Sequence, residues 1–138
     1  MRKSILFVSL LFAAVLSACS KTQEKSSVQE KTESMSFIMV SMAEGLEIAK
    51  KNPDAIILDV RRDTEYNAGH IPGAVLFTME TISPKTAAKV LPDKDKLILI
   101  YCRSGRRSKI AAQNLLDLGY TNLIEFGGII DYDGELEY

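Results

Sequence analysis

Two short apolar runs, AIILDV (residues 55–60) and KLILIY (residues 96–101), constrain the fold of this chain more than any other feature. Both are too short for typical helices and rich in branched side chains, which is typical of strands buried in the middle of a parallel sheet. Each run follows a turn signal, NPD in the first case and LPDKD in the second. We therefore expect two central strands in one sheet.

Segments with helical spacing alternate with these strands. Residues 42–51 and 109–119 carry apolar side chains at helical intervals. In the second segment Ala111 and Leu115 share one face, and Gly119 stands where the end of a helix favours a left-handed residue. This alternation predicts an α/β domain with a mainly parallel sheet. Further short strands are expected at residues 73–77 and 122–126.

The first 18 residues are typical of an export signal and not of a folded domain. Arg2 and Lys3 precede an apolar run from Ile5 to Leu16. This run is too short to cross a bilayer, which takes about 20 residues, but it suits the core of a signal peptide. It leads into LSAC, which resembles the lipobox of bacterial lipoproteins and would make Cys19 the lipidated first residue of the mature protein. An ordinary signal peptide with a chance cysteine is the alternative.

Residues 19–36 predict a flexible tether, and residues 37–138 the folded domain. The tether is rich in Lys, Glu, Ser, Thr and Gln and cannot bury enough apolar surface to offset its ordering entropy. We expect an exported protein, anchored to the membrane through lipid on Cys19 and facing the extracytoplasmic side, in the periplasm or at the cell surface. A lipid on the Cys19 sulfur would exclude a disulfide with Cys102, the alternative for an exported protein, and would leave one free thiol.

The stretch YCRSGRRS (residues 101–108) puts Cys102 between a strand and a helix. It therefore lies at the carboxyl edge of the sheet, where open α/β folds place their sites. Backbone N–H groups at the helix start favour an anion, and with the nearby arginines they lower a cysteine pKa below its free value of about 8.5. Gly105 lets the loop curl so that successive N–H groups point inward. Cys102 is thus a candidate nucleophile that needs no separate base; a buried core cysteine beside solvated arginines is the alternative.

Three segments resemble the rhodanese family in its single-domain form: LDVRRDTEYNAGHIPGAV (58–75), YCRSGRRS (101–108) and LGYTNLIEFGGI (118–129). The resemblance implies a compact α/β domain with a parallel five-stranded sheet flanked by helices. It also implies a sulfurtransferase in which Cys102 takes a sulfane sulfur from a donor such as thiosulfate. The sulfur would be held as a persulfide and passed to a thiol or to cyanide.

Within this resemblance, the loop after the cysteine binds the donor and the persulfide. Thiosulfate and the leaving sulfite are both anions, which arginine side chains attract, and backbone N–H groups would cradle the persulfide as they cradle oxyanions elsewhere. Ser104 and Ser108 can add hydroxyl donors, although Ser108 would serve equally well as a helix N-cap. The candidate loop residues are Arg103, Ser104, Gly105, Arg106, Arg107 and Ser108.

Asp59, Arg61 and His70 are candidate supporting residues. Asp59, at the end of its strand, is expected to pair with a loop arginine, Arg107 foremost. Arg61 and Glu65 are expected to form an ion pair that fixes the following turn. His70 is the one histidine of the chain, and the resemblance implies a structural role for its GHIPGA segment and a cysteine that works without a histidine base.

Loop length separates sulfurtransferases from their phosphatase relatives, which carry a Cys-x5-Arg loop sized for phosphate. Cys102 to Arg107 is the shorter Cys-x4-Arg form, which favours sulfur transfer. A phosphatase or arsenate reductase remains a lesser alternative because an arginine still closes the loop. A non-catalytic rhodanese-like module that binds a partner or senses sulfane sulfur is a further alternative, although such modules typically lack the cysteine.

Composition narrows the range of partners. The formal net charge of -1 and the absence of Trp give no reason to expect nucleic acid. No metal or cofactor is implied, and we expect a monomer that meets a small anionic sulfur donor and a thiol acceptor. The family's usual tryptophan after GGI is Tyr132 in this chain, a difference expected to weaken C-terminal packing without touching a catalytic position.

Overall fold

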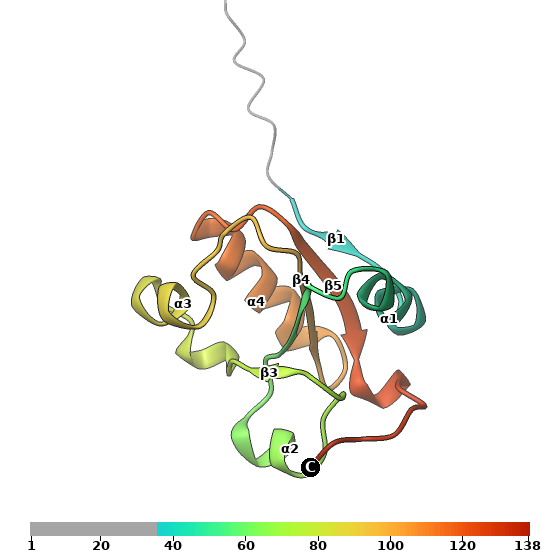
Figure 1. Cartoon of the computed structure of the whole chain (residues 1–138). Coiled ribbons are helices and arrows are strands. Elements are labelled where there is room, and N and C mark those ends of the chain that lie inside the picture. Colours follow the sequence, from blue (N-terminus) through green and yellow to red (C-terminus); the bar gives the residue numbers. More distant parts are fainter. Residues whose placement is uncertain (1–35) are drawn as a thin grey trace, which may run out of the picture. The chain divides into compact units, whose positions relative to one another are not determined.

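A five-stranded parallel sheet forms the centre of the domain (Figure 1). The structure, a computed structural model, describes residues 36–138, so the predicted signal peptide, Cys19 and nearly all of the tether lie outside the described residues. The strand order is β1-β5-β4-β2-β3, and every neighbouring pair is parallel. This confirms the expected fold. The strands are β1 (Ile38–Met39), β2 (Ile56–Asp59), β3 (Val75–Leu76), β4 (Ile98–Cys102) and β5 (Leu123–Gly128).

Helices cover both faces of the sheet (Figure 1). Helices α3 and α4 pack on one face, where their buried side chains share a core cluster with β2 and β4. Helix α1 packs on the other face, together with the segment that follows β5. The helical segments are α1 (Met42–Lys51), α2 (Asp63–Asn67), α3 (Pro84–Val90) and α4 (Arg106–Asp117), with short 3-10 turns at η1 (Met79–Thr81) and η2 (Ile129–Asp131).

Strand β4 lies in the middle of the sheet and is buried on both faces. Ile98, Ile100 and Cys102 belong to the core on the α4 side, whereas Leu99 and Tyr101 belong to the core on the α1 side. Side chains of a strand alternate between its two faces, so a strand buried on both sides has no polar face to show in its sequence. That is the physical reason for the continuous apolar run of residues 97–101.

Local capping explains where the main helices begin and end. Ser41 and Glu44 form a capping box at the start of α1, and Ser83 caps α3 with Pro84 as its first residue. Gly119, the residue after the C-cap of α4, has φ +88°, the left-handed conformation expected from the sequence. Among residues 36–138 no helix is both long and apolar enough to cross a membrane.

Several elements differ from the sequence-based expectation. The segment expected as a strand at 73–77 pairs only through Val75 and Leu76. The strand expected at 122–126 continues to Gly128, because the ladder with β4 is irregular between Ile100 and Cys102 and resumes at Gly128. The edge strand β1 and the short helices α2 and α3 were not identified from the sequence, since none has a run long enough to show a period.

Candidate active site

Cys102 is the last residue of β4, and α4 begins four residues later at Arg106. This is the strand-to-helix position expected from the sequence. The cysteine is 1% exposed and is a free thiol. Its sulfur therefore lies just below the surface at the carboxyl edge of the sheet, where the loop of residues 103–105 folds over it.

The loop curls around the sulfur because of Gly105. Gly105 has φ +88°, a conformation that other residues rarely adopt, and it occupies the N-cap of α4. Its backbone N–H donates a hydrogen bond to Sγ of Cys102, with 3.1 Å between nitrogen and sulfur. The hydroxyl of Ser108 lies 3.5 Å from the same sulfur. The predicted role of Gly105 in turning N–H groups inward agrees with this geometry.

Two opposing effects set the pKa of the Cys102 thiol. Burial raises the pKa and is the largest single effect, but the hydrogen bonds of the Ser108 hydroxyl and of the Ser108, Ser104 and Gly105 N–H groups together outweigh it. The net result is a pKa below the ordinary value for cysteine. Hydrogen bonds, including those of the backbone N–H groups expected from the sequence, are thus the leading cause of the lowering.

The three arginines of the loop region occupy different environments. Arg103 and Arg106 are exposed, whereas Arg107 is half-buried. Both terminal nitrogens of Arg107 bind the carboxylate of Glu65, at 2.6 Å and 2.7 Å. Arg107 therefore links α4 to α2, and both of its terminal nitrogens are occupied by Glu65. Arg103 and Arg106 have the exposure that an anion-recruiting residue needs.

The two predicted ion pairs are wrong, because each arginine takes the acid assigned to the other. Arg61 binds Asp59 at 2.6 Å, and Arg107 binds Glu65. The physical reason is that Asp59 is fully buried at the end of β2, where the chain turns back on itself. The guanidinium of Arg61, two residues later, reaches this carboxylate together with the Arg61 backbone N–H. Glu65 is left on the helix surface, where Arg107 reaches it.

Asp59 also binds the neighbouring strand. The hydroxyl of Tyr101 donates to Oδ2 of Asp59 at 2.7 Å, and the guanidinium of Arg61 donates onward to the carbonyl oxygen of Gly69 at 2.9 Å. These buried bonds join β2, β4 and the segment after α2. Asp59 and Arg61 support the carboxyl edge of the sheet from beneath and do not contact the sulfur.

His70 makes contacts of a structural kind. Its ring stacks on Tyr66, with 3.6 Å between centroids, and Nδ1 donates to the Tyr66 carbonyl oxygen at 3.0 Å. Its backbone exchanges two hydrogen bonds of 2.9 Å with Glu137. These contacts tie the C-terminal segment to α2. They agree with the structural role expected for His70.

The predicted helix N-cap at Ser108 is wrong. Ser108 is the third residue of α4 and is fully buried, and the N-cap position belongs to Gly105. The Ser108 hydroxyl donates instead to Oε1 of Glu125 on β5, at 2.6 Å. Ser108 lies between Glu125 and Cys102 and places its hydroxyl group next to the sulfur, which is the alternative role expected from the sequence.

Glu125 is the site residue that the sequence reading missed. It is a charged residue inside an apolar strand, and it is 2% exposed. Oε1 accepts hydrogen bonds from the Ser108 hydroxyl and from the Gly127 N–H, at 2.6 Å and 3.0 Å. The signal in the sequence was a lone acidic residue within the segment NLIEF, and this segment directly precedes two glycines.

The two glycines after Phe126 let β5 pass close beneath the loop. Gly127 has φ +91° and accommodates the irregular register with β4. At Gly128 a side chain would collide with the carbonyl oxygen of Arg103 and with the Cα of Ser104. The loop therefore packs directly against Gly128, and a residue with a side chain does not fit at this position.

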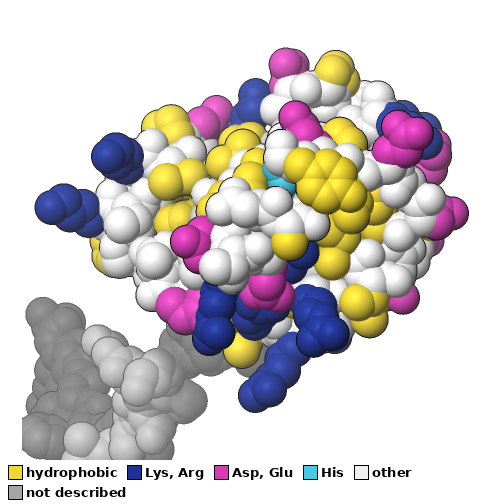
Figure 2. All heavy atoms as spheres, turned by 90° about the horizontal axis from the view of Figure 1, so that it is seen from below, with side chains coloured by type: hydrophobic (Ala, Val, Ile, Leu, Met, Phe, Trp, Pro, Cys, Tyr) yellow, Lys and Arg dark blue, Asp and Glu magenta, His cyan; other side chains and the backbone are white. Residues whose placement is uncertain are grey.

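Clefts lie on both sides of the loop. One of about 410 Å³ is bordered by Arg61, Glu65 and Arg103 and by an apolar wall; the apolar side chains of that wall are Ile129, Ile130, Tyr132 and Leu136. From the carboxyl edge, Lys and Arg side chains gather next to apolar ones (Figure 2). The surface beside the loop is thus both basic and apolar.

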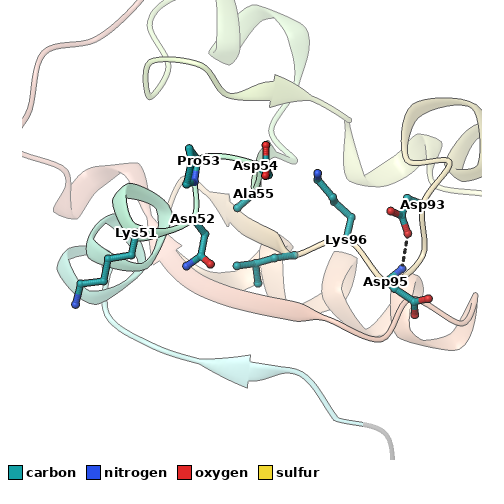
Figure 3. A pocket seen from close by; sticks show the side chains of 9 residues that line it. Lys51, Asn52, Pro53, Asp54, Ala55, Asp93, Asp95 and Lys96 are labelled. Carbon is teal, nitrogen blue, oxygen red and sulfur yellow. Dashed lines mark hydrogen bonds between the residues drawn. The ribbon is translucent and has the colours of Figure 1, made fainter.

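A further hollow, of about 440 Å³, lies at the opposite edge of the sheet (Figure 3). Its walls are the two turns that precede β2 and β4, including Lys51, Asp54, Asp93 and Lys96. The Asp95 N–H donates to the Asp93 carboxylate at 3.0 Å within one of these turns. No cysteine or histidine lines the hollow. Its walls are the turns that the NPD and LPDKD motifs predict. Among residues 36–138 no group of three or more His, Cys, Asp or Glu could hold a metal ion.

Comparison with known families identifies the fold. Residues 42–132 match the family described as Rhodanese-like domain. This match covers more than half of the chain and includes β2, the Cys102 loop and the glycine pair of β5. The chain belongs to the rhodanese-like family.

Curated relatives include two thiosulfate sulfurtransferases. GlpE of Pseudoalteromonas translucida is 34% identical over 96 residues, which cover 68% of this chain and 86% of the relative. PspE of Escherichia coli K12 is 34% identical over 74 residues, covering 54% and 70%. A tRNA uridine(34) hydroxylase of Hamiltonella defensa is 35% identical over 86 residues, covering 59% of this chain and 24% of the relative. The chain thus spans about a quarter of the length of that hydroxylase.

Solved structures show the same fold. The structure described as rhodanese with anions from E. coli has a TM-score of 0.54 and 30% identity, covering 60% of this chain and 96% of the other. The SSP1007 protein of Staphylococcus saprophyticus has a TM-score of 0.63 and 27% identity, covering 74% and 100%. The chain is therefore related in sequence to thiosulfate sulfurtransferases and in fold to a rhodanese.

Proposed function

We propose that this protein is a sulfurtransferase that carries a sulfane sulfur on Cys102. One observation supports this most directly: the Gly105 N–H donates to the Cys102 sulfur at 3.1 Å, at the end of a buried strand and the start of a helix. This arrangement favours a negatively charged sulfur without a histidine base. The relation to thiosulfate sulfurtransferases supports the same activity.

The proposed reaction has two displacement steps. The Cys102 thiolate attacks the outer sulfur of thiosulfate, a new S–S bond forms, and the S–S bond of thiosulfate breaks so that sulfite leaves with the electron pair. A thiolate or cyanide acceptor then attacks the outer sulfur of the persulfide. The Cys102 thiolate leaves with its electron pair, and the site returns to its starting state.

The donor is proposed to be a small anion. Backbone N–H groups around the sulfur and the exposed side chains of Arg103 and Arg106 give this edge a positive character. The half-buried Arg107 is less suited to bind a phosphate, because both of its terminal nitrogens are bound to Glu65. This disfavours the phosphatase alternative.

Intact mass spectrometry tests the activity. The protein would carry Cys19→Ser, so that Cys102 is the one remaining thiol, and would be measured before and after thiosulfate and then after cyanide. We expect one added sulfur that cyanide removes, and no addition in a Cys102→Ser variant. No added sulfur from thiosulfate or other sulfane donors would contradict the proposal.

We also propose that the protein is an exported lipoprotein held at the membrane through Cys19. The support is the order of charges, apolar run and LSAC motif in residues 1–19. Expression of the full chain in a bacterium, followed by membrane fractionation, tests this. Wild-type protein should sediment with membranes and carry a lipid on its first mature residue, and Cys19→Ala should abolish both; soluble wild-type protein would contradict the proposal.

A further inference from the structure

Glu125 is a buried carboxylate to which sulfur transfer, as described above, assigns no role. It lies on β5 at 2% exposure, in a strand that otherwise contributes apolar side chains to the core. Burying a carboxylate is costly unless hydrogen bonds compensate for lost water. Oε1 of Glu125 accepts two hydrogen bonds, and one of them comes from Ser108 beside the reactive sulfur.

Ser108 connects this carboxylate to Cys102. Its Oγ lies 2.6 Å from Oε1 of Glu125 and 3.5 Å from Sγ of Cys102. A hydroxyl has one proton to donate, and the short contact assigns that proton to Glu125. Ser108 therefore presents a lone pair to the sulfur, which matches a protonated thiol donating to Oγ. The three groups form one chain from sulfur to carboxylate.

We propose that Glu125 is a positioning residue that controls the ionisation of Cys102 through Ser108. When the thiolate forms, the S–H proton passes to Ser108 Oγ while the Ser108 proton passes to Oε1 of Glu125. The S–H bond and the original Ser108 O–H bond break, and new O–H bonds form on Ser108 and Glu125. The electron pair stays on sulfur, toward which the Ser108 hydroxyl now points.

The net charge of the three groups remains minus one throughout this exchange. A carboxylate and a thiolate joined through one serine would otherwise be two like charges in a partly dry site. The shared proton avoids that arrangement and leaves the thiolate with a hydroxyl donor. The role of the chain in sulfur transfer rests on the proposed function, whereas the ionisation itself does not.

A cleft of about 450 Å³ brings solvent next to Glu125. Lys109 from α4, Glu44 from α1 and Ser104 from the loop line this cleft together with Glu125. At the sulfur end of this hydrogen-bonded chain, the positive charge of Arg107 acts on Cys102. Arg103 directly follows Cys102 in the loop. A proton held by Glu125 can therefore exchange with water without passing the sulfur.

The rate of Cys102 alkylation as a function of pH tests the proposal. The full chain would be treated with iodoacetamide from acidic to alkaline pH, and modification of Cys102 would be quantified in its own peptide by mass spectrometry. Two coupled groups that share a proton titrate as a pair. We expect two steps in the wild-type profile, separated by more than about one pH unit, with partial reactivity between them.

Glu125→Gln and Ser108→Ala should each convert this profile to a single step. Glutamine retains an acceptor for Ser108 but cannot take up its proton, and alanine breaks the chain. Glu44→Gln is the matched control: it removes one negative charge from the same cleft, does not contact Ser108, and keeps the capping box of α1, which accepts either residue. This control should keep both steps.

Three results would overturn the proposal. These are a single-step wild-type profile that Glu125→Gln reproduces, a two-step profile that survives in both variants, and a Glu44→Gln profile that loses the lower step.

Thermal unfolding checks that each variant is folded. If Glu125→Gln is not, Glu125→Asp decides: its shorter side chain keeps the charge and withdraws from Ser108, so it should weaken the lower step, and an unchanged profile would count against the proposal. Because alkylation needs no sulfur donor, its outcome is independent of whether a persulfide forms.

Discussion

Tyr101 donates its phenolic hydrogen to Asp59 across the neighbouring strands β4 and β2, with 2.7 Å between the two oxygens. Both residues are fully buried, and the same carboxylate holds the guanidinium of Arg61. Burial, reinforced by the hydrogen bond to Asp59, raises the pKa of Tyr101, so its hydroxyl remains a donor. Asp59 therefore joins two strands and one turn at the residue that precedes Cys102.

Replacing Asp59 should destabilise the domain more than any exposed substitution. In Asp59→Ala the buried Arg61 would lose its counter-charge, which typically costs about 3–5 kcal/mol of unfolding free energy. Tyr101→Phe is the matched control, because Asp59 keeps Arg61. It removes one neutral donor from Asp59 and the acceptor of the Ile71 N–H, at about 1–3 kcal/mol in total. Urea denaturation of both variants measures the difference. An Asp59→Ala protein with full stability would show that this carboxylate is dispensable.

The Arg107–Glu65 pair should make stability depend on pH. The hydrogen bonds from Arg107 hold the pKa of Glu65 at about 2, below its ordinary value of 4.5. A lowered folded-state pKa gives stability that is complete above the unfolded pKa and is lost as pH falls through the folded pKa. Glu65→Gln should therefore be less stable than wild type at pH 7, by about 1–2 kcal/mol for a pair intermediate between exposed and buried.

Denaturation of wild type and Glu65→Gln at several pH values measures this contribution. The difference between the two proteins should shrink between about pH 4.5 and 2, where Glu65 becomes protonated. A difference that stays constant down to pH 2 would mean that the ion pair does not stabilise the fold.

Gly128→Ala should disturb the loop that holds Cys102. Its new methyl group would meet the carbonyl oxygen of Arg103 and the Cα of Ser104, both backbone atoms that cannot yield alone. We expect about 1–3 kcal/mol of destabilisation from overpacking, together with slower alkylation of Cys102. Gly73→Ala is the control: it introduces a methyl group at φ +76° into open space, should cost about 1 kcal/mol through backbone strain, and should leave Cys102 reactivity unchanged. Equal alkylation rates in the two variants would show that the Cys102 loop does not depend on a glycine at position 128.

Arg103→Gln should impair use of an anionic donor without affecting stability. Arg103 is exposed and borders the cleft beside the loop. We expect kcat/KM for thiosulfate to fall about tenfold, which corresponds to about 1.4 kcal/mol, and the effect to shrink at high salt. Arg106→Gln is the comparison, since Arg106 is equally exposed and does not border that cleft. Steady-state kinetics at two salt concentrations distinguish the two arginines, and equal losses would assign recruitment to overall charge.

The central elements could be predicted because their physics is local. A strand buried on both faces needs a continuous apolar run, so β2 and β4 were visible in the sequence, and with them the location of Cys102. Gly105 and Gly119 were also visible, because a left-handed turn selects glycine. In contrast, β1 has two residues, and its pairing depends on β5, which lies far along the chain.

The partners of charged side chains could not be predicted in the same way. Asp59, Arg61, Glu65 and Arg107 offered two pairings with equal charge balance, and the depth of each carboxylate decided between them. Glu125 was missed for a related reason. In a short strand next to glycines, a single acidic residue is compatible with either face, and only the packing of α4 against β5 brings Ser108 to it.

The parallel direction of all five strands puts the start of the described chain and the reactive thiol at opposite edges of the sheet. The chain enters β1 from the amino edge of the sheet, whereas Cys102 ends β4 at the carboxyl edge. Changes to the residues that lead into β1 should therefore leave the surroundings of the thiol intact.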